Sequence, residues 1–216
     1  MSKVLFISYF FAPHNDAGTF RSVNFVKRLP GKGIEPIVIT TTRDSILEKG
    51  GRIDETINQG LPADIEIIRI EDTNSAFKFW SKIKLYRIPW TLCYRKFIDV
   101  YASWSRSMVD PAVEKIKSES IPIIYVSCAP ISAAYSAIKI KKRTGAKLVV
   151  DFRDPFTDAY GYIFPGKINW KVAGKIERQI VEEADSVIVN TNEVKKLFIR
   201  KYPSFESKIN VITNGY

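Results

Sequence analysis

The sequence alternates short apolar segments with segments of helical periodicity along almost its whole length. A parallel sheet covered on both faces needs strands that are apolar throughout, and the crossovers between such strands are usually helices. The expected strands are residues 4–9, 36–40, 65–70, 121–126, 147–150, 186–189 and 209–212. The expected helices are residues 19–29, 53–59, 91–108, 110–117, 131–143, 170–183 and 193–202, with Asp110 as an N-cap. We therefore predict an α/β fold with a doubly wound, mostly parallel, Rossmann-like sheet.

Length and composition fit a globular unit with an anionic partner. A chain of 216 residues fits one α/β domain or two small ones, and 45% hydrophobic residues allow a substantial core. The formal charge of +10 favours phosphate groups, acidic lipid or nucleic acid as partners. Cys93 and Cys128 show no metal-ligand spacing, so we expect a reduced, cytoplasmic chain that binds no metal.

The apolar run at 4–12 resembles a signal peptide only superficially. It is about as short as the shortest signal-peptide cores, and no small-residue cleavage motif follows it. We expect a buried first strand there. No segment reaches the roughly 18 apolar residues that a membrane-spanning helix needs.

The strand expected at 147–150 runs directly into a dense group of polar residues. Asp151, Arg153 and Asp154 follow it, and Pro155 stops it. Groups just past the carboxyl end of a parallel strand face the ligand crevice, which makes this stretch a candidate site. The alternative is an ordinary turn, because Asp-Pro and Arg-Asp pairs also form turns and ion pairs. We expect Asp151 to cap the strand and Asp154 to be the functional carboxylate.

Gly18 stands where the loop at 10–18 becomes a helix. Its missing side chain lets a ligand approach the backbone, and a helix N-terminus favours negative charge, although a plain turn glycine is the alternative. Arg21, in the first helical turn, either reaches an anion or points into solvent. His14 is the only histidine and a candidate general base. We prefer a solvated or hydrogen-bonded loop residue, because no carboxylate is evidently placed to orient the ring.

Residues 74–108 combine aromatic and basic side chains. The aromatic residues are Phe77, Phe79, Trp80, Tyr86, Trp90, Tyr94, Phe97, Tyr101 and Trp104. The basic residues are Lys78, Lys82, Lys84, Arg87, Arg95, Lys96 and Arg106, and the single acid is Asp99. This composition fits a membrane-surface segment that binds anionic lipid, or a surface that stacks on single-stranded nucleic acid. A helix that packs its aromatic face on the sheet is the third possibility, and it suits residues 91–108.

Small or polar residues recur at four expected strand ends, namely 17–18, 127–130, 151–154 and 190–192. Because the carboxyl ends of parallel strands meet at one edge of the sheet, this recurrence favours a site at that edge.

Five motifs occur in a familiar order. They are Tyr9-Phe10-Phe11-Ala12-Pro13 with Gly18, Ser127-x-x-Pro130, Val150-Asp151-Phe152-Arg153-Asp154-Pro155-Phe156, Ala184-Asp185-Ser186-Val187-Ile188-Val189-Asn190 and Ile212-Thr213-Asn214-Gly215-Tyr216. Together they span the chain, which resembles the N-terminal domain of GT-B fold glycosyltransferases of the retaining family 4 type, the glycosyltransferase group 1 superfamily. The resemblance implies that residues 1–216 form a single Rossmann-like, acceptor-binding domain. The C-terminal donor-binding domain is then absent from this chain, and the domain alone is expected to be inactive.

The resemblance also implies a reaction. A hexosyl group moves from a nucleotide-sugar donor to a hydroxyl of a glycan or lipid-linked acceptor, with retention of configuration and with no metal or other cofactor. The expected setting is polysaccharide biosynthesis by a cytoplasmic, peripheral protein at the inner face of the membrane, which the basic aromatic segment at 74–108 would contact.

The site motifs match this family with two departures. Many relatives have two adjacent glycines where this chain has Ala17 and Gly18. Some relatives carry a histidine a few residues after the Ser-x-x-Pro motif, where this chain has Ala134 and Tyr135, so no catalytic histidine is assigned.

The Arg-Asp pair of the third motif is the best candidate for chemistry. An arginine can neutralise a phosphate or a carboxylated acceptor, and an aspartate can orient or deprotonate an acceptor hydroxyl. The predicted site has Asp154 as the catalytic residue, Arg153, Pro130, Ser127 and Arg21 as acceptor-binding residues, and Gly18 as the contact to the donor phosphate.

Two other classes of protein fit parts of the sequence. One is a non-enzymatic basic α/β module that binds nucleic acid or an anionic membrane surface through 74–108. The other is a nicotinamide-dependent enzyme, which is disfavoured because Gly18 lacks the three-glycine spacing. With the transferase as the leading interpretation, we expect no nucleic-acid partner.

Overall fold

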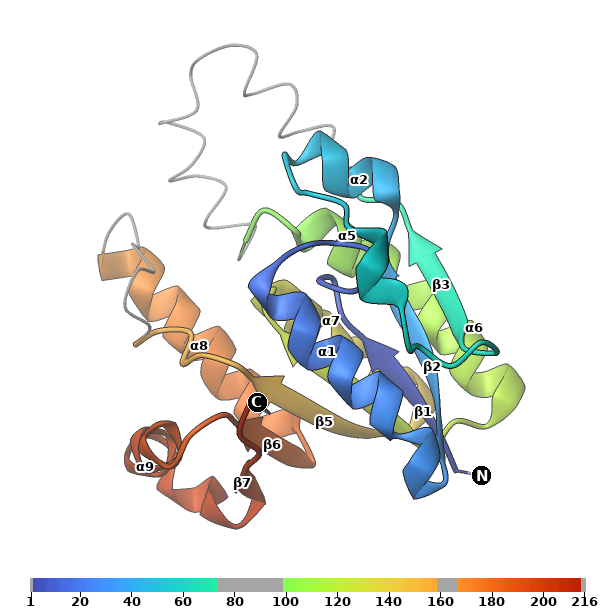
Figure 1. Ribbon diagram of the computed structural model, residues 1–216. Helices are drawn as coiled ribbons and strands as arrows, with labels where there is room; N and C mark the ends of the chain where they lie inside the picture. The colour runs from blue at the N-terminus through green and yellow to red at the C-terminus, as the bar shows by residue number, and fades with distance from the viewer. Residues whose placement is uncertain (1, 74–98, 159–166, 215–216) are drawn as a thin grey trace.

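The computed structural model describes residues 2–73, 99–158 and 167–214, and it contains a parallel sheet with helices on both faces (Figure 1). The strands are β1 (Ser2–Ile7), β2 (Ile34–Thr41), β3 (Glu66–Ile70), β4 (Ile123–Cys128), β5 (Lys147–Phe152), β6 (Ser186–Val189) and β7 (Ile209–Val211). They pair in the order β3-β2-β1-β4-β5-β6-β7, and every pairing is parallel. The predicted doubly wound α/β fold is confirmed.

The strand order reverses between β1 and β4. From β1 the sheet grows toward β3 on one side and toward β7 on the other. Loops that leave neighbouring strands at such a switch point diverge, and this opens a ligand crevice at the carboxyl ends of the strands. Residues after β1, β4 and β5 therefore lie together at the carboxyl edge of the sheet.

Helices connect the strands. Within the described residues they are α1 (Ala17–Arg28), α2 (Arg43–Glu48), α5 (Ala102–Ser107), α6 (Val109–Glu119), α7 (Ile131–Thr144), α8 (Lys167–Glu183) and α9 (Asn192–Lys201). Short 3-10 helices cover Pro30–Lys32, Glu55–Asn58 and Pro203–Lys208. None of the helices in the part of the chain that the structure describes is long and apolar enough to cross a membrane.

The two faces of the sheet bury separate cores. Leu5 and Ile7 of β1 face a core that includes residues of α5 to α9, while Val4 and Phe6 face a smaller core with α1. This alternation follows from the period of two in a strand. It also decides where the polar residues of β5 point, because Val150 and Phe152 lie in the larger core and Asp151 therefore faces α1.

Several predicted boundaries were wrong. β5 continues through Phe152, so Asp151 lies within the strand and does not cap its end. Met108 precedes α6 as its N-cap, while Asp110 lies in the first turn and pairs with Arg143 at 2.5 Å. The helix expected at 53–59 is a 3-10 turn, and α2 was not predicted.

The helix predicted at 91–108 can be judged only in part, because residues 74–98 lie outside the described chain. Within the described part, α5 buries Trp104 completely and Met108 follows it into the core. The aromatic side chains of this part pack into the core beside β1, for example Trp104 against Tyr9. This agrees with the third possibility for the segment, a helix that packs its aromatic face on the sheet. The membrane prediction for the basic residues before it stays a prediction.

Candidate active site at the carboxyl edge of the sheet

Asp151 is buried completely and forms a paired charge with α1. Arg21 donates from Nε to Asp151 Oδ2 at 2.7 Å and from Nη2 to Oδ1 at 3.0 Å, and the Tyr125 hydroxyl donates to the same carboxylate. Burial, and then the negative charge of Asp151, raise the pKa of Tyr125 well above its ordinary value. A buried carboxylate with three donors is stable because its desolvation is offset by hydrogen bonds.

Arg21 also holds the segment that follows β7. Its guanidinium donates to the Ile212 carbonyl at 2.8 Å and to Asn214 Oδ1 at 2.9 Å. The predicted first-turn cation thus reaches an anion, and that anion is a carboxylate of the same chain. Most N–H donors of Arg21 are thus occupied by the protein itself. Its predicted contact with an acceptor stays a prediction.

Arg153 lies directly on Gly18, so the structure brings together two residues of the predicted site. A Cβ built on Gly18 would lie 1.8 Å from Arg153 Nη1, which only a glycine avoids. The Arg153 Cζ lies 5.7 Å from the centre of the Phe10 ring, and its buried Nε has no hydrogen-bond partner. The guanidinium is thus held by packing, and its Nε is buried without a hydrogen-bond partner.

The Gly18 amide does not face an open site. It donates to Oδ1 of Asp16, the N-cap of α1, at 2.8 Å. The predicted contact between Gly18 and a donor phosphate stays a prediction, and in this structure the cationic group at the same place is Arg153.

Asp154 is exposed, and its carboxylate makes no hydrogen bond or ion pair with any residue that the structure describes. It begins a short segment that turns from β5 toward α8. An exposed carboxylate next to a positioned guanidinium can accept a hydrogen bond from a ligand hydroxyl.

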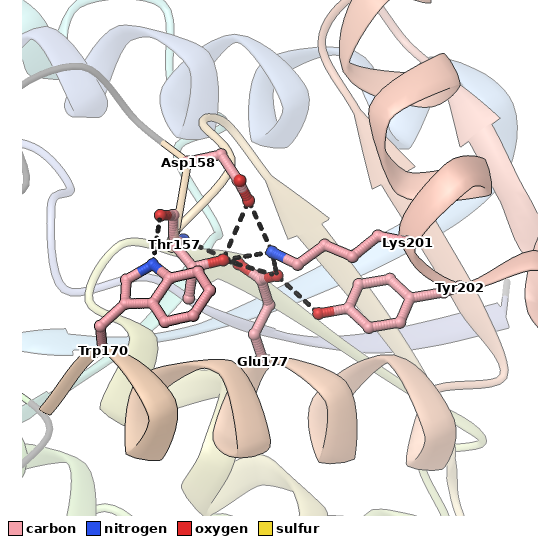
Figure 2. Close-up of polar contacts among 6 residues, drawn as sticks. All are labelled: Thr157, Asp158, Trp170, Glu177, Lys201 and Tyr202. Atoms are coloured by element: carbon pink, nitrogen blue, oxygen red, sulfur yellow. Dashed lines mark hydrogen bonds and ion pairs between the residues drawn. The ribbon is translucent and has the colours of Figure 1, made fainter. Parts of the chain in front are cut away.

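A buried polar cluster fixes this segment from behind (Figure 2). Glu177 of α8 is fully buried and accepts from the Thr157 amide at 2.9 Å, from Lys201 Nζ at 2.6 Å and from the Tyr202 hydroxyl at 2.6 Å. The Trp170 indole N–H donates to the Thr157 carbonyl at 3.2 Å. These contacts tie residues 155–158 to α8 and α9.

Lys201 lies between the two carboxylates of this cluster. Lys201 also pairs with Asp158 at 2.5 Å. Burial would raise the pKa of Asp158, but the hydrogen bonds from Lys201 and Thr157 outweigh it and lower that pKa below its ordinary value. Glu177 was not predicted from the sequence as a residue that supports the site. The available signal was a carboxylate on an apolar helix face, between Ala173, Ile176 and Ile180.

The Ser-x-x-Pro motif lies on the adjacent strand. Ser127 is buried opposite Asp151 in the β4–β5 register, and Pro130 is the N-cap of α7. Pro130 offers no capping side chain, and Asp99 supplies one instead, accepting from the Ser132 amide at 2.9 Å. Ser127 thus lies on the α1 side of the sheet edge, as Asp151 does.

The fourth predicted strand end, at 190–192, has a structural use. Thr191 is the N-cap of α9 and accepts from the Val194 amide.

His14 is neither solvated nor hydrogen-bonded through Nδ1, which corrects the interpretation preferred from the sequence. The ring is buried, lies tilted beside the Phe10 ring at 5.2 Å between centroids, and leaves Nδ1 without a partner. Burial lowers its pKa, against a smaller opposing effect of Asp16. Across the described ranges, no group of three or more His, Cys, Asp or Glu residues is arranged to hold a metal ion.

Comparison with known proteins adds to this geometry. A family model described as Glycosyltransferase Family 4 matches residues 21–216. No curated protein sequence matches the chain.

Several solved structures share the fold. The Anabaena protein HepE in complex with UDP-glucose superposes with a TM-score of 0.58 at 14% identity, covering 100% of this chain and 44% of that one. Sucrose-phosphate synthase from Thermosynechococcus elongatus gives 0.58 at 12% identity, covering 100% and 49%. A UGT transferase from Siraitia grosvenorii in complex with UDP gives 0.54 at 12% identity, covering 100% and 51%. The chain thus spans about half the length of these proteins.

Proposed function

The chain belongs to glycosyltransferase family 4, and from this membership we propose that its sheet edge forms one side of a sugar-transfer site. The proposed reaction moves a hexosyl group from a nucleotide sugar to a hydroxyl of a glycan or lipid-linked acceptor, with retained configuration. The observation that carries the proposal is the Arg153 guanidinium, which is seated on Gly18 with Nε unpartnered at the edge where ligands bind in this fold.

Each residue of the edge has a proposed task. Arg153 neutralises a phosphate or another anionic group of a substrate. Asp154 accepts a hydrogen bond from the acceptor hydroxyl and orients it, with Ser127 and Pro130 beside the acceptor. The Glu177 cluster positions Asp154 through the segment at 155–158. We propose no resident metal or cofactor, so activity should persist in EDTA.

The donor class and the second half of the site are also proposals. HepE was solved with UDP-glucose and the Siraitia grosvenorii transferase with UDP, which supports a nucleoside diphosphate sugar as the donor. Because the chain spans about half of these proteins, we propose that a second domain supplies further donor contacts. We place the protein in the cytoplasm, peripheral at the inner membrane face, in polysaccharide synthesis.

The test uses the full-length protein and a panel of nucleotide sugars with lipid-linked and soluble glycan acceptors. Asp154→Asn should lower kcat by about 10²–10⁴-fold without a change in Tm, because the carboxylate has no described partner to lose. Arg153→Gln should raise the KM of the anionic substrate by about tenfold or more.

Two variants complete this design. Gly18→Ala should reproduce the effect of Arg153→Gln, because the added Cβ displaces the guanidinium while alanine suits a helix. Arg178→Gln changes an exposed ion pair on α8 and should leave kcat and KM unchanged. Unaltered turnover in Asp154→Asn and Arg153→Gln would reject the assignment.

A further inference from the structure

The chain returns toward the candidate site after its last strand. β7 is the end of the sheet order and is separated from β5 by β6. Residues 212–214, which we call the post-β7 segment, nevertheless meet Arg21 of α1, and Arg21 is paired with Asp151 of β5. The segment therefore comes back to the strand from which Arg153 and Asp154 follow.

Polar contacts hold the post-β7 segment in place. The Ile212 amide donates to the Val189 carbonyl of β6 at 3.0 Å. The Arg21 guanidinium then donates to the Ile212 carbonyl at 2.8 Å and to Asn214 Oδ1 at 2.9 Å. The side chains of the segment are exposed, so burial of apolar surface contributes little to its position.

Arg21 is itself a fixed support. Its side chain is only 7% exposed, and two of its nitrogens donate to the fully buried carboxylate of Asp151. The Tyr125 hydroxyl donates to the same carboxylate, and Arg21 Cζ lies 5.1 Å from the centre of the Phe25 ring. A buried hydrogen-bonded network of this kind holds its members rigidly in one arrangement.

The guanidinium suits this double contact. It carries five N–H donors in a planar fork, so it can bind a carboxylate and two carbonyl oxygens at the same time, whereas a lysine ammonium is a single point charge. Arg21 and Asn214 are 193 positions apart, so their contact is not a local turn or cap. Departure of the segment would leave N–H groups of Arg21 without these acceptors, which is costly.

We propose that Arg21 is a positioning residue for sugar transfer, because it fixes the direction in which the chain continues after β7. This role rests on the proposed function, in which a second domain supplies donor contacts. A link held against β5 limits where that domain can lie relative to Arg153 and Asp154. Transfer requires the donor and the acceptor hydroxyl to meet in a defined geometry, and a small misplacement lowers the rate strongly.

Hydrogen exchange in this 216-residue chain tests the anchor. Asn214→Ala removes one acceptor of Arg21 and leaves the pair with Asp151 intact, so Tm should not change. The Ile212 amide should then exchange about tenfold faster, as expected for the loss of one hydrogen bond to a charged group. Arg21→Lys keeps a cation beside Asp151 and should accelerate this exchange at least as much, because an ammonium cannot hold all the acceptors.

Kinetics of the full-length protein test the consequence. Asn214→Ala should lower kcat about tenfold and leave the KM of the acceptor unchanged, because the residues proposed to bind the acceptor are intact. Asn214→Asp places a carboxylate oxygen where the amide oxygen was, so it should restore both the slow exchange of Ile212 and kcat. Aspartate would not rescue a residue that instead contacts a substrate through its amide N–H groups.

Asn210→Ala is the matched control. Asn210 is another exposed asparagine, on β7, and its amide donates to the Lys208 carbonyl at 3.1 Å and to Ser186 Oγ at 3.2 Å. These contacts do not involve Arg21. The variant should therefore leave the exchange of Ile212 and kcat unchanged.

Three results would overturn the positioning role: unchanged exchange of Ile212 in Asn214→Ala and Arg21→Lys, unchanged kcat despite faster exchange, or no rescue by Asn214→Asp. The proposed transferase function fails in a different way. Absence of turnover in the wild-type full-length protein rejects the transferase together with the role that rests on it. Turnover that is insensitive to Asn214→Ala rejects the positioning role alone.

Discussion

The three charged residues between 151 and 154 have three different environments. Asp151 is fully buried and paired with Arg21, Arg153 is partly buried against Gly18, and Asp154 is exposed. Their spacing along the sequence did not distinguish these roles, because each role depends on a residue more than 100 positions away or on the absence of a partner. The cationic charge of Arg153, rather than the backbone of Gly18, is what the structure presents at the sheet edge.

His14 allows a test at the scale of one residue. Its pKa is lowered by burial, so the folded protein binds this proton less tightly than the unfolded chain, whose histidine titrates near 6.5. The contribution of His14 to stability is therefore complete above pH 6.5 and is lost as the pH falls through 6.5 toward the folded pKa. The slope is at most about 1.4 kcal/mol per pH unit.

Urea unfolding at pH 7.5, 6.5 and 5.5 measures this effect. The free energy of unfolding should fall more steeply with acid in the wild-type protein than in His14→Gln, whose side chain does not titrate. The nearby groups that also carry charge are Asp16, Asp72 and Lys49, which are the same in both proteins. Parallel pH profiles would contradict the buried, neutral state of the ring.

At the scale of elements, the segment after β5 is held by helices that follow it in the chain. Thr157 contacts Glu177 on α8, and Glu177 contacts Lys201 and Tyr202 at the end of α9. Figure 2 shows the Glu177 carboxylate between the segment and α9. Two helices thus hold Thr157 and Asp158, which follow Asp154 by three and four positions.

Glu177→Gln should lower the free energy of unfolding by about 1–3 kcal/mol, because the partly buried Lys201 ammonium keeps only Asp158 as an anionic partner and one buried acceptor oxygen is replaced by a donor NH2 group. The neighbouring substitution Arg178→Gln should change it by less than about 0.5 kcal/mol, since that pair with Glu182 is exposed. Urea denaturation of both variants measures the difference. Equal losses would mean that the cluster contributes no more than a surface ion pair.

At the scale of the whole molecule, the positive charge is distributed unevenly along the chain. The basic residues Lys78, Lys82, Lys84, Arg87, Arg95 and Lys96 contribute six of the ten net positive charges, because residues 74–98 contain no acid. Such a run favours an anionic surface as a partner.

The chain should therefore float with phosphatidylserine vesicles at low salt. Replacing Lys78, Lys82 and Lys84 by Gln should weaken binding by about 10²-fold, from roughly 1 kcal/mol per charge. The matched control replaces three exposed lysines elsewhere, Lys139, Lys147 and Lys196, and should have a smaller effect. Equal loss in both triple variants would indicate only overall charge, and tighter binding to a single-stranded oligonucleotide at the same salt would contradict a membrane partner.

The sequence by itself determined the order of the seven strands along the chain, the α/β class and the family. These features depend on local periodicity and on short motifs, so they can be predicted without knowing which segments are in contact in the folded protein. Two predicted boundaries were wrong, the start of the helix at Asp110 and the end of β5. In both cases the element extends beyond the residues whose local pattern predicted it.

Only the tertiary structure decided which side chains share a site. Arg21 meets Asp151 across 130 positions, and Arg153 meets Gly18 across a similar separation. Tyr9, which follows β1, packs against Trp104 of α5 with 5.1 Å between the ring centroids. Those meetings depend on the strand order β3-β2-β1-β4-β5 and on which face of the sheet each residue takes. The physical reason is that contact between distant residues is a property of the packed chain, which local sequence patterns do not specify.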